Sequence, residues 1–433
     1  MSPTLTHSTW VAVIGGGPGG LMAAEVLATA GASVTVFERM PSVGRKLLLA
    51  GRGGLNLTHS EPLDAFLGRY GPARSVMAAA IDRFGPDDLR AWCAGLGEEP
   101  FVGSSGRVFP AGFRATPLLR AWLRRLGELG VEIRTRHEWT GWTDDGHALT
   151  FTDGTGSPVV HPSATTVLAF GGASWPRTGS NGAWVAPVEA AGIAVTPLRA
   201  ANSGFTVDWS PAFADRFAGT PLKNVRLSVG RRRKGGPAAI RTEALITHTG
   251  IEGSGIYALS RPLRDGIDRA GQVTLTIDLQ PDRSNQQVAD RLTQGRPKDS
   301  VSTALRRATG LAPVAIALLR EATANQLPSA PLELAQLIKS VPITLVGTEP
   351  IDRAISTAGG IGLDQIDESF MLRTRPGTFV ASEMLDWDAP TGGYLLQATF
   401  STAVVAAQGA IDWLSAGAGG PAGSSSEEGA VAE

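Results

Sequence analysis

The sequence predicts an α/β fold in which a doubly wound parallel sheet is interrupted by an inserted β-barrel-like and helical region. Residues 11–38 show the pattern of strand, glycine turn, helix and second strand. After about residue 200, short alternating runs with turn signals indicate antiparallel strands, and a leucine-rich helical pattern follows. Glycines and buried strands return at Thr357. We therefore expect one domain to be built from both ends of the chain.

The changes of pattern give approximate boundaries for five segments. They are a first part of the main domain at 1–200, a β-rich insert at 201–280, a helical piece at 281–344, the second part of the main domain at 345–415 and a disordered tail at 416–433.

The composition is that of a soluble globular protein, because 42% of the 433 residues are hydrophobic and 18% are charged. The formal net charge of −1 gives no general attraction to nucleic acid or to an anionic membrane, so we expect neither as a partner. The one cysteine, Cys93, excludes an internal disulfide and a redox C-x-x-C pair, and it suits a cytoplasmic protein. No signal peptide and no apolar run of roughly 20 residues is visible.

The opening unit carries a complete dinucleotide-binding pattern. Gly15, Gly17 and Gly20 form G-x-G-x-x-G between a buried strand and a helix, and Glu38 stands 18 residues after Gly20. Such glycines let the backbone approach a pyrophosphate, and the helix N-terminus offers free N–H groups. The carboxylate accepts hydrogen bonds from ribose hydroxyls.

Glu38 also narrows the choice of nucleotide, because an acidic side chain at this position repels a ribose 2′-phosphate. FAD or NAD is therefore expected rather than NADP. Arg39 either stacks on the adenine or is solvated. The candidates in this unit are Gly15, Gly17, Pro18, Gly19, Gly20, Glu38 and Arg39.

Five further segments occur in order along the chain: GRKLLLAGRGGLNLT, GRVFP, FGGASWPRTGSNG, THTGIEGSG and ASEMLDWDAPTGGYLLQ. Together with the opening unit, they resemble the BaiN/RdsA-like flavoproteins, a family of NAD(P)/FAD-dependent oxidoreductases, from about Val11 to Leu414. The resemblance implies a Rossmann-type FAD-binding domain built from both ends of the chain. It also implies FAD as the cofactor.

The resemblance carries cofactor contacts over to named positions. Beyond the opening unit, it implies contacts with FAD at Arg45, Lys46, Gly51, Gly53, Gly54, Asn56, Trp139, Glu383, Asp386 and Leu395. The remaining candidates in the matching segments are Gly171, Gly172, Gly392, Gly393 and Tyr394.

Three departures from the family pattern mark a distinct subgroup. The family often reads Gly-Arg-Cys-Asn-Leu-Thr, whereas this chain lacks the arginine and cysteine before Asn56. Ser382 stands where the family usually has glycine, and its Cβ is expected to crowd a backbone that must approach the cofactor. Leu395 replaces an asparagine, so a side-chain hydrogen bond is lost there.

Physical chemistry alone also gives interpretations of several of these residues. Gly51, Gly53 and Gly54 let the backbone lie flat against a flavin ring, or they belong to a flexible surface loop. Gly392 and Gly393 open a long apolar helix whose N-terminus is suited to stabilise negative charge on a reduced flavin; the alternative is a packing helix that begins with glycine. Lys46 pairs with a phosphate or the flavin, or lies on the surface.

Acid–base and metal chemistry have few candidates in this sequence. His248 is the best proton donor among six histidines, although a structural histidine is the simpler interpretation. No spacing of histidine or cysteine indicates a metal site. No second dinucleotide-binding unit is found, so NAD(P)H as electron donor is expected to bind transiently over the flavin.

The resemblance implies an oxidoreductase in which flavin N5 gives hydride to an activated C=C bond or conjugated carbonyl of a small molecule. Two alternatives stay open, a tRNA-modifying flavoprotein and a non-catalytic FAD-binding redox sensor. The net charge of −1 argues against the former. The oligomeric state is left open.

Overall fold

The computed structural model describes residues 10–146, 148–163, 165–230, 239–294 and 300–417. The chain forms two compact units, one made of the described parts of 1–199 and 358–433 and the other of 200–357. The segment from 416 that was expected to be a disordered tail lies, from residue 418 on, outside the described residues.

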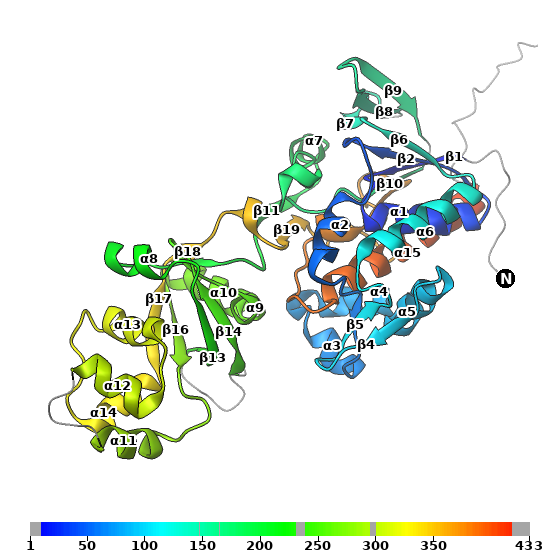
Figure 1. Ribbon diagram of the computed structural model, residues 1–433. Helices are drawn as coiled ribbons and strands as arrows, with labels where there is room; N and C mark the ends of the chain where they lie inside the picture. Colours follow the sequence, from blue (N-terminus) through cyan, green and yellow to red (C-terminus); the bar gives the residue numbers. More distant parts are fainter. Residues whose placement is uncertain (1–9, 147, 164, 231–238, 295–299, 418–433) are drawn as a thin grey trace, which may run out of the picture. The chain divides into compact units, whose positions relative to one another are not determined.

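The first unit is organised around a five-stranded parallel sheet with the order β20-β10-β1-β2-β6 (Figure 1). Its strands are β1 (Trp10–Ile14), β2 (Ser33–Glu38), β6 (Glu132–Thr135), β10 (Thr166–Leu168) and β20 (Thr378–Val380). The chain moves from β1 through β2 to β6 on one side and then adds β10 and β20 on the other. This reversal of direction beside β1 is the feature of a doubly wound sheet.

Different layers cover this sheet. Helices α1 (Pro18–Thr29) and α15 (Tyr394–Ser415) pack against each other and on β10 (Figure 1). A three-stranded antiparallel sheet of β7 (Glu138–Trp142), β8 (Ala148–Thr152) and β9 (Pro158–Pro162) packs through Phe151, whose ring stacks on Phe37 of β2 at 4.5 Å between centroids. The central strands are therefore buried, as their near-continuous apolar runs require.

One buried carboxylate joins three helices of this unit. Glu25 of α1 accepts hydrogen bonds from the indole N–H groups of Trp92 (3.1 Å) and Trp122 (2.6 Å) and from the Arg125 guanidinium (2.9 Å). These partners come from α5 (Pro86–Gly95) and α6 (Ala115–Glu128). A buried carboxylate is tolerated because every approaching group donates to it.

The rest of the first unit consists of short elements. They are α2 (Arg45–Ala50), the 3-10 turn η1 (Gly51–Gly53), β3 (Thr58–His59), α3 (Leu63–Gly68), α4 (Arg74–Arg83), β4 (Pro100–Val102), β5 (Arg107–Pro110), α7 (Val185–Ala190), β11 (Val195–Ala200), β19 (Thr357–Ile361) and the 3-10 turn η5 (Ser382–Met384).

The second unit contains a seven-stranded antiparallel sheet with the order β17-β16-β13-β14-β15-β12-β18. Its strands are β12 (Phe205–Thr206), β13 (Pro221–Val229), β14 (Ile240–Ile246), β15 (Gly250–Glu252), β16 (Val273–Asp278), β17 (Val341–Leu345) and β18 (Gly347–Thr348). The two outermost strands, β17 and β18, are consecutive in the chain and separated by Val346 alone. The sheet is therefore barrel-like and nearly closed, as the sequence predicts.

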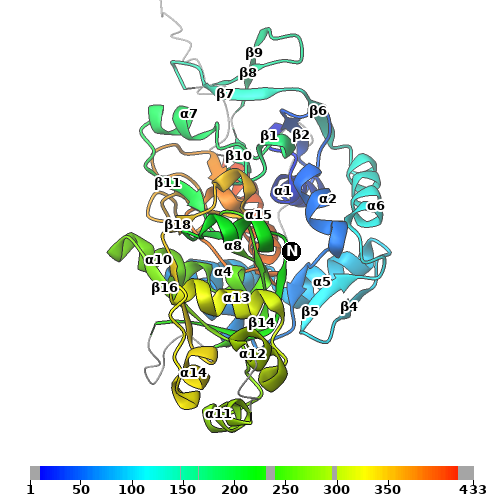
Figure 2. The same cartoon turned by 60° about the vertical axis from the view of Figure 1, so that its left-hand side comes forward.

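Helices complete the second unit, and α11 to α14 gather beside β16 and β17 (Figures 1 and 2). They are α8 (Pro211–Phe217), α9 (Ser254–Ala258), α10 (Ser260–Ala270), α11 (Asn285–Thr293), α12 (Val301–Thr309), α13 (Pro313–Ala322) and α14 (Pro331–Ile338). The prediction of an α/β fold with an inserted β-rich and helical region is thus confirmed. Within the described residues, no helix combines the length and apolar character that crossing a membrane requires.

Candidate functional site

The three glycines in the turn between β1 and α1 have different structural roles. A Cβ at Gly15 would lie 2.5 Å from the carbonyl oxygen of Ala169, and one at Gly20 would lie 1.8 Å from that of Gly15. These two positions therefore need glycine for packing. A Cβ at Gly17 would meet no atom within 4 Å, so this glycine borders open space. Pro18 begins α1, and no side chain caps the N–H groups of its first turn. Such free N–H groups suit a phosphate.

Glu38 lies directly at this turn. Its Oε2 accepts a hydrogen bond from the backbone N–H of Gly16 (2.8 Å), and its Oε1 accepts one from Met40 (2.7 Å). Burial raises the pKa of Glu38, although these N–H bonds oppose the shift. Each oxygen retains a second lone pair, so the carboxylate can still accept a bond from a ribose hydroxyl. Arg39 lies 3.6 Å from Glu138, and both interpretations of its role stay open.

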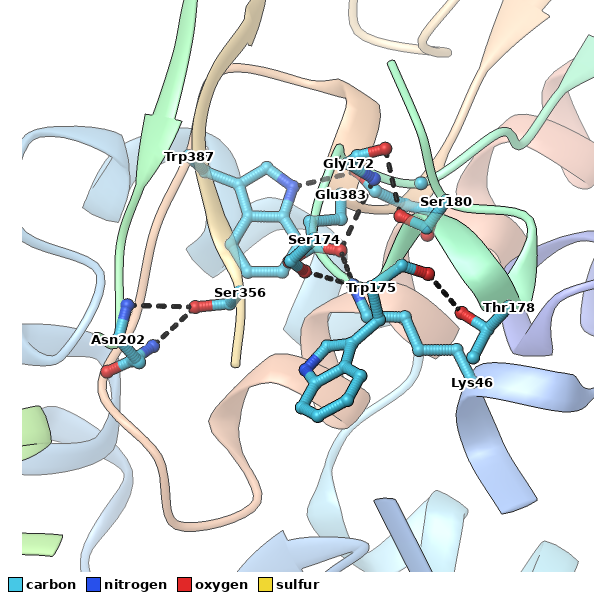
Figure 3. Close-up of polar contacts among 12 residues, drawn as sticks. Lys46, Gly172, Ser174, Trp175, Thr178, Ser180, Asn202, Ser356, Glu383 and Trp387 are labelled. Carbon is cyan, nitrogen blue, oxygen red and sulfur yellow. Dashed lines mark hydrogen bonds and ion pairs between the residues drawn. The ribbon is translucent and has the colours of Figure 1, made fainter. Parts of the chain in front are cut away.

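Three segments far apart in the sequence meet at Lys46 (Figure 3). The Lys46 ammonium on α2 lies 2.8 Å from Glu383 Oε2 on η5 and 2.7 Å from the hydroxyl of Ser174. The same Glu383 oxygen accepts a bond from the Gly172 N–H at 3.3 Å. Both charged side chains are largely buried. The structure therefore brings together Lys46, Gly172 and Glu383, which the sequence predicts as cofactor contacts.

The loop from Gly171 to Ser180 is fixed by its own hydrogen bonds. The Gly171 carbonyl accepts from the indole of Trp184 (3.0 Å), and the Gly172 carbonyl accepts from the hydroxyl of Ser180 (2.9 Å, Figure 3). Gly171 has a φ of +77°, which few other residues adopt. The loop thus holds the N–H of Gly172 in a fixed place beside Glu383.

The glycine-rich segment that follows α2 combines tight packing with open space. A Cβ at Gly51 would lie 2.6 Å from Ala115, and one at Gly54 (φ +119°) would lie 2.4 Å from the ring of Phe113. A Cβ at Gly53 would meet nothing within 4 Å. The segment therefore presents bare backbone at Gly53, as close approach to a planar ring requires.

The start of α15 is anchored on this same region. Gly392 and Gly393 have positive φ, and a Cβ at Gly393 would lie 2.4 Å from the carbonyl oxygen of Thr58 in β3. The Tyr394 hydroxyl donates to Glu61 (2.7 Å), and the hydroxyl of Tyr70 donates to the Tyr394 carbonyl (2.8 Å). Burial raises the pKa of Tyr394, and its bond to Glu61 adds to the shift. The helix N-terminus is thus held against the strand that follows the glycine-rich segment.

Three further predicted cofactor contacts, Gly19, Leu395 and Asp386, belong to α1, to α15 and to the loop before α15. Gly19 packs in α1 with its Cα against the side chain of Ser382. Leu395 is the second residue of α15, and Asp386 is half-buried with its backbone N–H bonded to Ile361 (2.8 Å).

Unpaired buried atoms test whether these residues suit a polar ligand. Arg45 Nε, Asn56 Oδ1 and Trp139 Nε1 are buried and have no hydrogen-bond partner among the described residues. All three belong to predicted cofactor contacts. They are three of twelve such atoms among the described residues, and others, such as Ser203 Oγ and Thr247 Oγ1, belong to the second unit, so these atoms alone do not mark a ligand site. Thr58 Oγ1 is another of the twelve, which sequence reasoning missed.

His248 belongs to the second unit, in the turn between β14 and β15. Its imidazole Nε2 lies 3.2 Å from Asp215 Oδ1, and both side chains are more than two-thirds exposed. Its role as proton donor stays a prediction. Across the described residues, no group of three or more histidine, cysteine or carboxylate side chains is arranged to hold a metal ion.

Sequence reasoning also missed Ser174 and Glu61. Ser174 stands inside the FGGASWPRTGSNG segment, so that motif was a signal for it. Glu61 has no motif signal, because its importance depends on a helix that begins more than 300 residues later.

Comparison with known proteins places the chain in a wider context. The family model described as "HI0933-like protein Rossmann domain" matches residues 9–409. A Haemophilus influenzae protein named ribosomal RNA dihydrouridine synthase is 26% identical over 410 residues, covering 91% of this chain and 96% of the relative. An Escherichia coli protein of the same name is 24% identical, covering 92% and 97%.

Solved structures resemble the chain more distantly. The quinol fumarate reductase subunit FrdA of E. coli is 13% identical with a TM-score of 0.49, covering 96% of this chain and 72% of that one. A 3-ketosteroid dehydrogenase from Sterolibacterium denitrificans is 12% identical with a TM-score of 0.49, covering 93% and 99%. No functional conclusion rests on likenesses of this size.

Proposed function

The chain belongs to the HI0933-like family of Rossmann-type FAD-binding oxidoreductases, and from this premise we propose that it reduces an activated C=C bond or a conjugated carbonyl with electrons from NAD(P)H. Bound FAD would supply the two-electron chemistry that links oxidation of the nicotinamide to reduction of the acceptor. A proton from the protein or from water completes the reduction of the acceptor.

The observation that carries this proposal is the convergence of Lys46, Ser174 and Glu383 beside the glycine-rich segment. We propose that Glu38 and the first turn of α1 bind the ADP half of FAD, and that the other sequence candidates of the first unit line the rest of it. Lys46 would then hold positive charge near the cofactor, with Glu383 fixing the ammonium in place.

We propose His248 as the proton donor. Its exposed imidazole, paired with Asp215, can exchange protons with solvent between turnovers. Replacing His248 with glutamine would then lower kcat without changing the affinity for FAD.

A second acceptor is favoured by the names of two relatives. Both are called ribosomal RNA dihydrouridine synthase. Dihydrouridine and uridine differ by hydrogenation of the C5=C6 bond, which in uracil is conjugated to a carbonyl. A uracil base in ribosomal RNA is thus a special case of the proposed acceptor class. An acceptor base in RNA would conflict with the expectation that this protein binds no nucleic acid.

The test begins by releasing and identifying the cofactor of the purified protein. NADH and NADPH oxidation is then measured anaerobically with a small enone and with ribosomal RNA transcribed without modification. Reduction of the enone supports the general proposal, and conversion of uridine in the transcript supports the RNA case. Flavin that neither nucleotide bleaches would contradict the reductase.

A matched pair of lysine variants tests the site. Lys46 pairs with Glu383 at 2.8 Å, and Lys339 in the second unit pairs with Asp278 at 2.8 Å with similar burial. We expect K46M to weaken FAD binding at least about tenfold because a charge-assisted contact is lost, while K339M leaves it unchanged. Equal FAD affinity of both variants would show that Lys46 is not a cofactor contact.

A further inference from the structure

A cluster of aromatic side chains lies on the surface beside the glycine-rich segment. The rings of Phe101 on β4, Phe109 on β5 and Phe113 in the following loop have centroids 4.7 to 6.0 Å apart and interplanar angles of 21° to 33°. We call these three residues the phenylalanine surface. Phe101 is 43% exposed, Phe113 is 42% exposed and the neighbouring Val102 is 46% exposed.

This exposure is concentrated rather than scattered. Phe101 and Phe113 are two of the ten exposed large hydrophobic side chains of the described residues and their rings are in contact, whereas Val102 lies on the opposite face of β4, where it pairs with the buried Val108. Single exposed apolar side chains need no explanation, whereas a contiguous apolar cluster on a soluble protein commonly marks a binding surface.

The backbone holds one of these rings in an unusual conformation. Phe113 has a φ of +59°, a left-handed conformation that is strained for a bulky residue. Two hydrogen bonds fix it, from the Phe113 N–H to the carbonyl of Pro110 (2.8 Å) and from the Leu55 N–H to the carbonyl of Phe113 (2.9 Å). This conformation places the Phe113 ring against Phe109 and beside Gly54.

The phenylalanine surface is continuous with the candidate cofactor site. The ring of Phe113 lies so close to Gly54 that a Cβ there would come within 2.4 Å of it. The bond from Leu55 joins the same two segments. Gly53, which directly precedes Gly54, borders open space. The Phe113 ring, which stacks on Phe109, therefore lies directly beside the bare backbone of the segment.

We propose that the phenylalanine surface stacks the planar, conjugated ring of the acceptor, so that the substrates of this chain are cyclic rather than linear. The inference rests on the proposed function and adds the substrate class to it. Offset stacking of flat rings on aromatic side chains is favourable and tolerates different ring substituents. The same stacking can hold a base, for which single-stranded nucleic acid is one source.

The test uses the holoenzyme and two acceptors of different shape, menadione as a planar ring and trans-2-hexenal as a linear enal. Phe101 is the residue to change because it is exposed and has no unusual backbone conformation. We expect F101A to raise the dissociation constant of menadione, measured by equilibrium dialysis with oxidised protein, at least about fivefold. The KM for menadione should rise in parallel, while the KM for trans-2-hexenal and the FAD content stay unchanged.

Two further variants keep the result interpretable. F101L retains apolar volume without a flat face, so it should weaken menadione binding in the same direction. V160A removes another exposed apolar side chain, on β9, and should leave binding unchanged. A uridine oligonucleotide added to the same dialysis tests whether the surface also binds a base in RNA. Displacement of menadione by the oligonucleotide would indicate an RNA base, and no displacement would indicate a free ring.

The outcomes separate this inference from the proposed function. Wild-type protein that reduces neither acceptor contradicts the proposed function, whereas the dialysis still tests the surface. Unchanged menadione binding in F101A and F101L overturns the inference. It is also overturned if W175F, a change at the other exposed aromatic next to the site, weakens binding and F101A does not. A change in oligomeric state on F101A would assign the surface to a second copy instead.

Discussion

Ser382 has a backbone conformation that side chains with a Cβ rarely adopt. Its φ is +75°, and the residue is buried beside Gly19. Its N–H donates to Thr402 (2.9 Å), and its carbonyl accepts from the indole of Trp387 (3.0 Å). These contacts hold the left-handed conformation in place. The glycine that the resemblance implies at this position would avoid this strain, whereas serine is strained there.

We predict that S382G stabilises the protein. Relief of the left-handed conformation contributes about 1 kcal/mol, and the greater freedom of glycine in the unfolded chain offsets part of it, which leaves roughly 0.5 kcal/mol. Urea unfolding of the FAD-saturated protein measures the difference. S382A keeps the Cβ and should gain nothing. A gain of equal size in S382A would trace the effect to the hydroxyl and not to the backbone.

Individual residues differ in how well the sequence predicts their role. Arg45 and Asn56 stand in a segment that resembles a family, and Trp139 lies between such segments within the overall match. The structure gives each of the three a buried atom without a partner among the described residues. Ser174 was not predicted, although it lies in one of those segments. The segment was a signal for Ser174 itself, but its bond to Lys46 joins residues 128 positions apart, so the pattern does not identify this partner.

At the scale of elements, the beginning of α15 is held by one carboxylate. Glu61 accepts bonds from Tyr394 (2.7 Å) and from two nitrogens of Arg69 (2.9 and 2.6 Å). The Arg69 guanidinium also lies over the ring of Tyr394, at 5.7 Å. Burial raises the pKa of Glu61, but the bonds from Arg69 and Tyr394 outweigh it, so the pKa is lowered overall from its usual 4.5.

This network gives a pH-dependent prediction. The folded protein binds the proton of Glu61 less tightly than the unfolded chain does. Its contribution to stability is therefore present above pH 4.5 and is lost as the pH falls through the lowered pKa. We expect E61Q to lower the free energy of unfolding by about 1 kcal/mol at pH 7. Urea unfolding should show this difference shrink below pH 4.5.

An exposed ion pair provides the control for E61Q. Arg74 and Asp64 form a pair on the surface, with the Asp64 side chain 89% exposed. D64N should change the stability by less than about 0.5 kcal/mol. A loss in E61Q that is the same at both pH values would show that the charge of Glu61 is not the cause.

Elements with local signals could be predicted from the sequence, and their pairing could not. The unit β1–α1–β2 is recognisable because turn glycines, apolar runs and the spacing to Glu38 lie within 28 residues. The addition of β20 beside β10 depends on a strand that returns after the whole insert. The apolar run of β20 predicts that this strand is buried, but it does not predict which strand β20 pairs with. The resemblance to a family implied only that this part of the chain belongs to the first domain.

At the scale of the whole molecule, the chain has two separate hydrophobic cores. One is centred on residues such as Val13, Phe37 and Phe379, and the other on Leu227 and Ile277. No buried residue belongs to both clusters. Each unit can therefore be stable by itself. All the predicted cofactor contacts lie in the first unit, and His248 lies in the second.

The chain leaves and re-enters the first unit through paired segments. The N–H of Ala201 donates to the carbonyl of Ser356 (3.0 Å), and that of Ile355 donates to the carbonyl of Asn202 (2.7 Å). Side-chain bonds between Asn202 and Ser356 add to this pairing (Figure 3). The bond from Ile355 to Asn202 is the one that closes a hairpin with a two-residue loop. Replacing residues 203–354 with Asn-Gly should therefore join the two segments without strain.

We predict that this deletion protein folds and binds FAD with an affinity within about tenfold of the full chain, because its core and its cofactor contacts are retained. Reduction of the acceptor should be at least as slow as in H248Q, since His248 is removed. Flavin absorbance and equilibrium dialysis measure the binding, and far-UV circular dichroism checks the fold. The same deletion carrying K46M should bind FAD weakly. A folded deletion protein that stays colourless with added FAD would mean that the insert supplies essential cofactor contacts, against the assignment of the site to the first unit alone.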